Sequence, residues 1–132
     1  MNHNTNEKLN IMAVDDEKIY QLLYDNLLKK YNNVDYQILK NGKEGLEYYL
    51  QNNEKIDIIF TDITMPEMDG IEMTKKIKKY ENNNNNNNNS KNVKIYAVSS
   101  ISRKDFKKEE YFFEFIQKQY LIDKLNSIIT KS

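Results

Sequence analysis

The chain has 132 residues, which suits one domain with a single hydrophobic core. Its 20 basic and 20 acidic residues cancel, so no bulk charge favours nucleic acid or an anionic membrane as a partner. It has no cysteine, which excludes disulfides and thiolate metal sites, and no apolar run long enough to cross a membrane. We therefore expect a cytoplasmic protein that binds neither nucleic acid nor membrane.

The first half of the chain alternates between short apolar runs and amphipathic segments. A polar tail over residues 1–7 is expected to be disordered. The apolar run at 9–14 predicts a buried strand, and 17–31 carries apolar residues at helical spacing. A second strand is predicted at 34–39, and a second helix at 43–52.

The second half repeats this alternation within a domain expected to span 8–132. The run at 56–60 is the strongest strand signal, and a helix is predicted over 71–80 after a Met-Pro loop. Eight consecutive asparagines have no apolar side chain to bury, so we expect an Asn-rich surface loop over 82–90. A strand, a charged surface helix, a fifth strand and a final helix follow at 93–98, 102–110, 114–117 and 121–129.

Strands and helices thus alternate five times, as (βα)5. This order predicts an α/β fold with a five-stranded parallel sheet, doubly wound, with helices on both faces. Ligands of such open sheets bind beyond the carboxyl ends of the strands, where the strand order reverses.

Polar side chains follow four of the predicted strands, at the point where each strand ends. Asp15 and Asp16 follow the first strand, Asp62 the third, Ser99 the fourth and Lys118 the fifth. A parallel sheet would bring all of them to one edge. The coincidence of these residues, more than any single pair, indicates a functional site.

The chemistry of this set points to phosphoryl transfer. Three carboxylates in one crevice repel one another, and a hard divalent ion such as Mg²⁺ would relieve that repulsion through oxygen ligands. A carboxylate beside such an ion can attack phosphorus and form an acyl phosphate. The Lys118 ammonium and the Ser99 hydroxyl would then bind the remaining phosphoryl oxygens.

Each residue also has an ordinary interpretation when taken alone. The Asp15-Asp16 pair could be a helix N-cap and its neighbour, Lys118 a solvated charge and Ser99 a turn residue. Asp62 is more specific, because it stands at a strand end directly before a loop constrained by Pro66.

Several motifs resemble the receiver domain of response regulators, the phosphoacceptor module of two-component systems. The resemblance covers nearly the whole chain, from about residue 8 to 131. It is strongest in VDDE at 14–17, NGKEGL at 41–46 and TDITMPEMDG at 61–70. AVSS at 97–100 and FIQK at 115–118 match more weakly but in the right order.

The resemblance implies a flavodoxin-like strand order, 2-1-3-4-5, and a role for each acidic residue. Asp62 would be the phosphoacceptor and a metal ligand. Asp16 would bind Mg²⁺ directly, Asp15 mainly through water, and the backbone carbonyl of Thr64 would complete the protein ligands. Lys118 would bind the phosphoryl group.

The resemblance also implies a switch. Ser99 would be the hydroxyl that moves toward the phosphate, and Phe115 would be the aromatic that turns inward on activation. Ordinary core packing of Phe115 is an equally good interpretation. After the lysine the family usually has a proline, often in a cis bond, whereas this chain has Gln119. The resemblance therefore leaves open whether the Lys118–Gln119 bond is cis or trans. The residues before the last strand are unusually aromatic, from Tyr111 to Phe113.

Phosphoryl groups would come from a histidine kinase or a histidine phosphotransfer protein. The only histidine, His3, lies in the polar tail and is an unsuitable donor. The chain would be a stand-alone receiver, a phosphorelay intermediate or an excised part of a hybrid histidine kinase, and the asparagine tract favours the last two. It would catalyse only its own phosphorylation and slow autodephosphorylation, and would switch a partner-binding face.

Two other functions fit parts of the sequence. A small hydrolase resembling haloacid-dehalogenase phosphatases would also use an aspartate after a parallel strand. Those enzymes carry it near the chain start with an acid two residues later, where this chain has Thr64. The other alternative is a degenerate receiver that only binds proteins. The presence of all three aspartates together with Ser99 and Lys118 argues against it.

Overall fold

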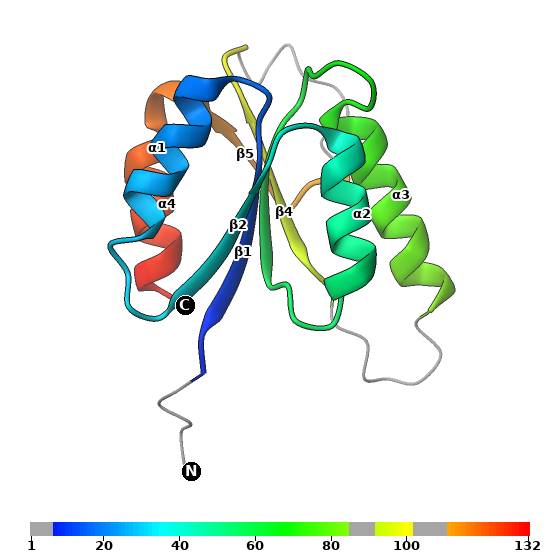
Figure 1. Ribbon diagram of the computed structural model, residues 1–132, viewed down its shortest axis with the longest axis horizontal. Helices are drawn as coiled ribbons and strands as arrows, with labels where there is room; N and C mark the ends of the chain where they lie inside the picture. Colours follow the sequence, from blue (N-terminus) through cyan, green and yellow to red (C-terminus); the bar gives the residue numbers. More distant parts are fainter. Residues whose placement is uncertain (1–6, 85–91, 102–110) are drawn as a thin grey trace.

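The computed structural model describes residues 7–84, 92–101 and 111–132. These residues form an α/β fold in which strands alternate with helices (Figure 1). The elements, in chain order, are β1 (Leu9–Val14), α1 (Lys18–Leu28), β2 (Val34–Leu39), α2 (Gly42–Asn52), β3 (Ile58–Asp62), α3 (Gly70–Asn83), β4 (Lys94–Ser99), β5 (Glu114–Gln117), the 3-10 helix η3 (Lys118–Tyr120) and α4 (Leu121–Thr130). None of the described helices has both the length and the apolarity needed to cross a bilayer.

All five strands pair in parallel, in the order β2-β1-β3-β4-β5. The predicted fold class and strand order are therefore confirmed. The order reverses between β1 and β3, because β2 lies on one side of β1 while β3, β4 and β5 follow on the other. Open sheets bind ligands at the carboxyl ends of the strands beside such a reversal.

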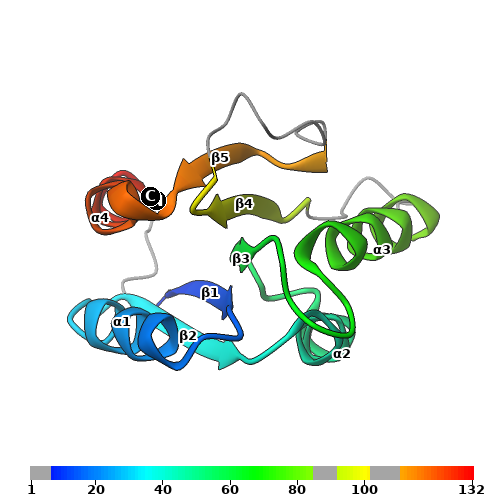
Figure 2. The same cartoon turned by 90° about the horizontal axis from the view of Figure 1, so that it is seen from above.

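Helices cover both faces of the sheet, with α1 and α4 on one face and α2 and α3 on the other (Figures 1 and 2). Side chains of a strand alternate between faces, so successive residues of β1 enter different cores. Ile11 and Ala13 pack with α1 and α4, whereas Met12 and Val14 pack with α2 and α3. Burial on both faces explains why the central strands read as continuous apolar runs.

Two strands lie slightly later than their apolar runs predict. The run at 56–60 becomes β3 at Ile58–Asp62, and β4 ends on Ser99. The pairing continues through these polar residues, with Asp62 opposite Val98. Asp62 and Ser99 are consequently the last residues of their strands, a more rigid position than a following loop.

The start of the asparagine tract is helical, contrary to the expected loop over 82–90. Asn82 and Asn83 end α3, and Asn84 caps it, all three exposed. The buried Glu81 carboxylate accepts a hydrogen bond from the Val93 N–H at 2.7 Å, which holds the end of α3 against the start of β4. The remainder of the tract, the tail with His3 and the predicted helix at 102–110 lie outside the described residues.

Candidate functional site

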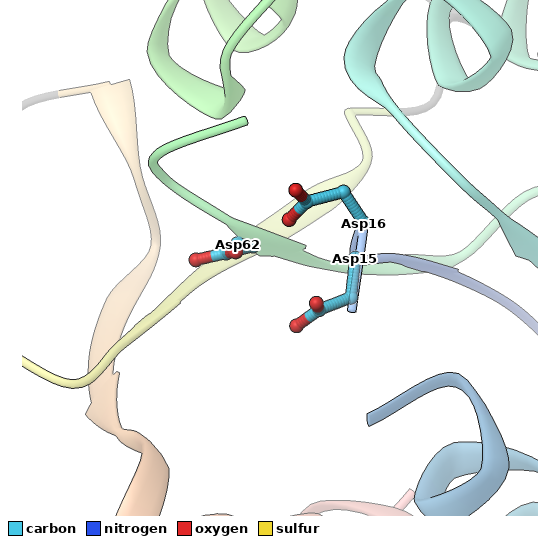
Figure 3. A group of neighbouring side chains, drawn as sticks. All are labelled: Asp15, Asp16 and Asp62. Atoms are coloured by element: carbon cyan, nitrogen blue, oxygen red, sulfur yellow. The ribbon is translucent and has the colours of Figure 1, made fainter. Parts of the chain in front are cut away.

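Three carboxylates converge at the carboxyl edge of the sheet. One carboxylate oxygen each from Asp15, Asp16 and Asp62 can be chosen so that all lie within 4.8 Å of one another. Figure 3 shows Asp15 and Asp16 at the end of β1 beside Asp62 at the end of β3. Asp15 is fully buried and Asp62 nearly so, whereas Asp16 faces solvent.

The acidic pair after β1 does not cap a helix. The N-cap of α1 is Glu17, and its side chain makes no capping hydrogen bond. Oδ1 of Asp15 accepts a hydrogen bond from the Glu17 N–H at 2.9 Å, which turns the chain into the helix. Oδ2 of Asp15 faces the ammonium of Lys118 at 3.3 Å instead. The ordinary N-cap interpretation of Asp15 and Asp16 is therefore wrong.

Asp62 is held by the backbone N–H of the next residue and by the start of α3. Its Oδ1 accepts a hydrogen bond from the Ile63 N–H at 2.8 Å. Gly70 packs so closely that a Cβ there would lie 2.0 Å from the Asp62 carbonyl oxygen. Any side chain at residue 70 would push this strand end away. In the loop between them, Glu67 has a φ of 67°, in the left-handed region that non-glycine residues seldom adopt.

Lys118 reaches the acidic cluster from the end of β5. Its side chain is 9% exposed, and its ammonium lies 3.3 Å from Asp15 Oδ2 and 3.6 Å from Asp62 Oδ2. The ammonium also lies 3.1 Å from Glu17 Oε1 and 4.0 Å from the centre of the Tyr20 ring. The predicted convergence of the lysine with the aspartates is therefore present in the structure.

The charges at this site are only partly balanced. Burial, and next the charge of Asp15, raise the pKa of Asp62 to about 6, although Lys118 and the Ile63 N–H lower it in part. Burial likewise raises the pKa of Asp15. Burial lowers the pKa of Lys118, but Asp15, Asp62 and Glu17 together raise it above the ordinary value, so the ammonium stays charged. A single ammonium among these carboxylates leaves an excess of negative charge, which a divalent cation would neutralise.

The other predicted residues differ in how deeply they are buried. Ser99 ends β4 with 6% exposure, and its Oγ accepts a hydrogen bond from the Ile101 N–H at 3.2 Å. Thr64 is exposed, two residues after Asp62. Phe115, 8% exposed, packs in the core beneath α2 and α3. The described backbone has no cis peptide bond, so Lys118 enters η3 through a trans bond to Gln119.

Three contributors were not predicted from the sequence. Glu17 and Tyr20, at the start of α1, contact the ammonium of Lys118. Tyr24, one turn later, is fully buried, and this burial, together with the charges of Asp15 and Asp62, raises its pKa well above the ordinary value. The i, i+3 spacing of Glu17 and Tyr20 was the one available signal, since it places both on one helix face.

The comparisons with known proteins agree on one family. The family model described as response regulator receiver domain matches residues 11–130. Two-component response regulator 24 of Arabidopsis thaliana is 30% identical over 129 residues, covering 94% of this chain and 84% of the relative. The 3',5'-cyclic-nucleotide phosphodiesterase regA of Dictyostelium discoideum is 29% identical over 73 residues. This match covers 55% of this chain but only 9% of the relative. Probable histidine kinase 4 of rice is 41% identical over 69 residues, a match that covers 52% of this chain and 7% of the kinase.

Solved structures agree with this fold. The Saccharomyces cerevisiae Ssk1 receiver domain, co-crystallised with the histidine phosphotransfer protein Ypd1, has a TM-score of 0.82 and 26% identity, covering 97% of this chain and 90% of that one. The receiver domain of the histidine kinase CKI1 from Arabidopsis thaliana, complexed with Mg²⁺, has a TM-score of 0.72 and 27% identity, covering 96% and 94%. The Thermotoga maritima response regulator TrrA in complex with Mg²⁺-BeF has a TM-score of 0.72 and 25% identity, covering 93% and 97%.

Proposed function

This chain belongs to the response regulator receiver family, and from this membership we propose that Asp62 accepts a phosphoryl group from a phosphohistidine on a partner protein. As a receiver domain, the chain is a signalling switch of the phosphorelay type. The observation that carries the assignment to Asp62 is its position. Its carboxylate lies within 4.8 Å of Asp15 and Asp16 and 3.6 Å from the Lys118 ammonium.

The acidic cluster fits a magnesium ion. Its donors are all oxygen atoms, and the pKa of Asp62 is raised by burial and next by the negative charge of Asp15, which Lys118 offsets only in part. Asp16 and Asp62 would bind the ion directly, Asp15 mainly through water, and the Thr64 carbonyl would complete the protein ligands. When bound, Mg²⁺ supplies neutralisation of the phosphoryl oxygens during transfer.

The transfer itself is a displacement at phosphorus. An ionised oxygen of Asp62 forms the new O–P bond while the N–P bond of phosphohistidine breaks, and the electron pair returns to the imidazole nitrogen. The Lys118 ammonium binds one phosphoryl oxygen and the Ser99 hydroxyl another. Attack of water on the same phosphorus later releases phosphate and regenerates the Asp62 carboxylate. The domain catalyses only these two reactions on itself.

The phosphodonor is a histidine kinase or a histidine phosphotransfer protein, and the proposed location of the domain is the cytoplasm. The Ssk1 receiver in complex with Ypd1 supports the second class of donor. Beside the acidic cluster, the first turns of α1 expose Ile19 at 71% and Leu22 at 52%. The two residues are three positions apart and share one helix face, so they form an apolar patch near the start of α1, where Glu17 contacts Lys118. We assign docking of the donor to this patch.

Phosphorylation would be relayed through Ser99 and Phe115. The phosphoryl group draws the Ser99 hydroxyl toward it, away from its contact with the Ile101 N–H. Phe115 lies on the neighbouring edge strand and is already buried. Phosphorylation of Asp62 would therefore favour one arrangement of the β4–β5 edge and of the neighbouring surface near α4.

The test is intact mass measurement after treatment with phosphoramidate. With Mg²⁺ the protein should gain one phosphoryl group, and chelation should prevent the gain. Asp62→Asn should abolish labelling, because the amide is not a nucleophile. Labelling of Asp62→Asn at the wild-type stoichiometry would place the phosphoacceptor elsewhere. Sustained phosphate release from a generic phosphomonoester would favour a hydrolase instead.

A further inference from the structure

The ammonium of Lys118 has two neighbours that the phosphoacceptor chemistry does not require. Glu17 Oε1 lies 3.1 Å from it, and the centre of the Tyr20 ring lies 4.0 Å from it. Glu17 is the N-cap of α1 and Tyr20 stands three residues later, so both project from the same side of the first turn. The start of α1 thus holds the lysine in addition to Asp15 and Asp62.

The two neighbours hold the ammonium in different ways. Glu17 is a carboxylate with a 56% exposed side chain, so water competes for its ion pair. Tyr20 is half-buried against the core beneath α1 and α4, which fixes the position of its ring. A ring face attracts a cation through its quadrupole but offers no charged oxygen. It can therefore hold the ammonium without neutralising the charge that a phosphoryl group needs.

A lysine at this position needs such support. Its four-carbon stem is flexible, and Lys118 stands where β5 ends and η3 begins. When a phosphoryl group reaches Asp62, the ammonium must leave the Glu17 oxygen for a phosphoryl oxygen. The Tyr20 ring can stay in contact through that exchange, because it does not compete for the same hydrogen-bond donor.

We propose that Tyr20 is a positioning residue: its ring holds the Lys118 ammonium beside Asp62, where it meets the incoming phosphoryl group. The inference rests on the proposed role of Asp62 as phosphoacceptor and adds a residue to that site. Tyr20 touches neither the phosphoryl group nor the carboxylates in this scheme, and acts only through the lysine.

The test compares Tyr20→Leu with Tyr20→Phe in the full chain. Initial rates of labelling by phosphoramidate are measured at saturating Mg²⁺, with a thermal melt of each variant. Loss of the ring should slow labelling about fivefold or more, whereas phenylalanine, which keeps the ring face, should stay within about twofold of wild type. Tyr48→Leu is the matched control, because Tyr48 is a half-buried tyrosine of α2 that packs on the opposite core.

Two readouts separate positioning from a general loss of structure. Ring currents should shift the ε-methylene protons of Lys118 upfield in wild type and Tyr20→Phe but not in Tyr20→Leu. In a Lys118→Met background, Tyr20→Leu should have no further effect on the rate. Magnesium affinity, measured by calorimetry, should be the same in both Tyr20 variants.

The outcomes are distinct. Equal labelling rates for Tyr20→Leu and wild type would overturn the inference, as would a Tyr20→Phe protein as slow as Tyr20→Leu. Absence of the upfield shift in wild type would overturn it without any substitution, even if Tyr20→Leu failed to fold. A wild-type chain that is not labelled at Asp62 would instead refute the proposed function, which is a separate result.

Discussion

The ammonium of Lys118 lies 3.6 Å from Oδ2 of Asp62, farther than it lies from Glu17 or Asp15, at 3.1 and 3.3 Å. The lysine is therefore held at the site by charges that are present before any phosphoryl group arrives. A phosphoryl group on Asp62 adds oxygen atoms on the side where the contact is longest. The lysine gains a closer partner as transfer proceeds, and contacts that strengthen toward the transition state accelerate a reaction.

Lys118→Met should slow labelling of Asp62 by about tenfold or more, because the variant keeps the apolar stem and loses the charge that binds a phosphoryl oxygen. The measurement is the initial rate with phosphoramidate at saturating Mg²⁺. Lys124→Met is a suitable control, since Lys124 pairs with Glu114 on α4 and β5, in a partly exposed contact. An unchanged rate for Lys118→Met would remove the ammonium from the transfer step.

The metal-free protein should lose stability as the pH rises through the range in which Asp62 titrates. Its pKa is about 6 in the folded chain and 3.8 for an ordinary aspartate. Below about pH 4 the carboxyl is protonated in both states, and above about pH 6 it is ionised in both, at a cost to the folded one. That difference amounts to up to about 3 kcal/mol of unfolding free energy.

Urea unfolding in chelator at pH 4.5 and 7.5 measures this effect. Asp62→Asn should flatten the dependence and be more stable than wild type at pH 7.5, since it carries no buried charge. Added Mg²⁺ should restore stability to wild type at pH 7.5 and have little effect on the variant. A wild-type chain that becomes more stable from pH 4.5 to 7.5 in chelator would contradict the prediction.

Transfer from a protein donor should depend on the apolar patch of Ile19 and Leu22. Ile19→Asp should slow transfer from a histidine phosphotransfer protein about tenfold or more, because it places a charge in a desolvated interface. Labelling by phosphoramidate should not change, since the small donor needs no docking surface. Leu50→Asp on α2 is the control, as Leu50 is also exposed but on the opposite face of the sheet. Equal losses with both donors would indicate damage to the site, not to docking.

Half of the asparagine tract should be removable. The Glu81 carboxylate already joins the end of α3 to the start of β4 through the Val93 N–H. The Lys78 ammonium lies between the same two residues, 3.2 Å from Glu81 Oε1 and 3.0 Å from the Val93 carbonyl oxygen. Deleting four of the eight asparagines changes the loop-closure entropy by only about 0.4 kcal/mol. Glu81→Ala should cost about 1–3 kcal/mol, because it leaves a buried N–H without its acceptor. Denaturant unfolding of the two variants compares them, and a deletion as costly as Glu81→Ala would mean that the tract itself stabilises the fold.

The strand ends could be predicted from the sequence because parallel order alone brings them to one edge. The runs at 9–14, 34–39 and 114–117 coincide with β1, β2 and β5. Where the prediction failed, the pairing continues past the apolar run, as at Asp62. Hydropathy cannot detect pairing of a polar residue, because the ladder forms through the backbone.

The surroundings of Lys118 were beyond prediction for a different reason. Glu17 lies 101 positions earlier in the chain. Whether the two side chains meet depends on how α1 is oriented above the sheet and on the rotamers of both, neither of which has a local sequence signal. The same holds for the first asparagines of the tract, where the end of α3 is held by the contact between Glu81 and Val93 and not by the propensity of asparagine.

Tyr24 provides a final test, because its hydroxyl is fully buried and has no hydrogen-bond partner among the described residues. A buried hydroxyl without a partner costs about 1–3 kcal/mol. Tyr24→Phe removes the oxygen and keeps the ring, whose centre lies 6.2 Å from the centre of the Phe60 ring. The variant should therefore be more stable by about 1 kcal/mol or more in denaturant unfolding. Phosphoramidate labelling should proceed at the wild-type rate, since among the described residues no hydrogen bond joins the Tyr24 hydroxyl to Asp15, Asp62 or Lys118. A less stable Tyr24→Phe would mean that the hydroxyl is satisfied in solution and belongs to the hydrogen-bonded structure of the site.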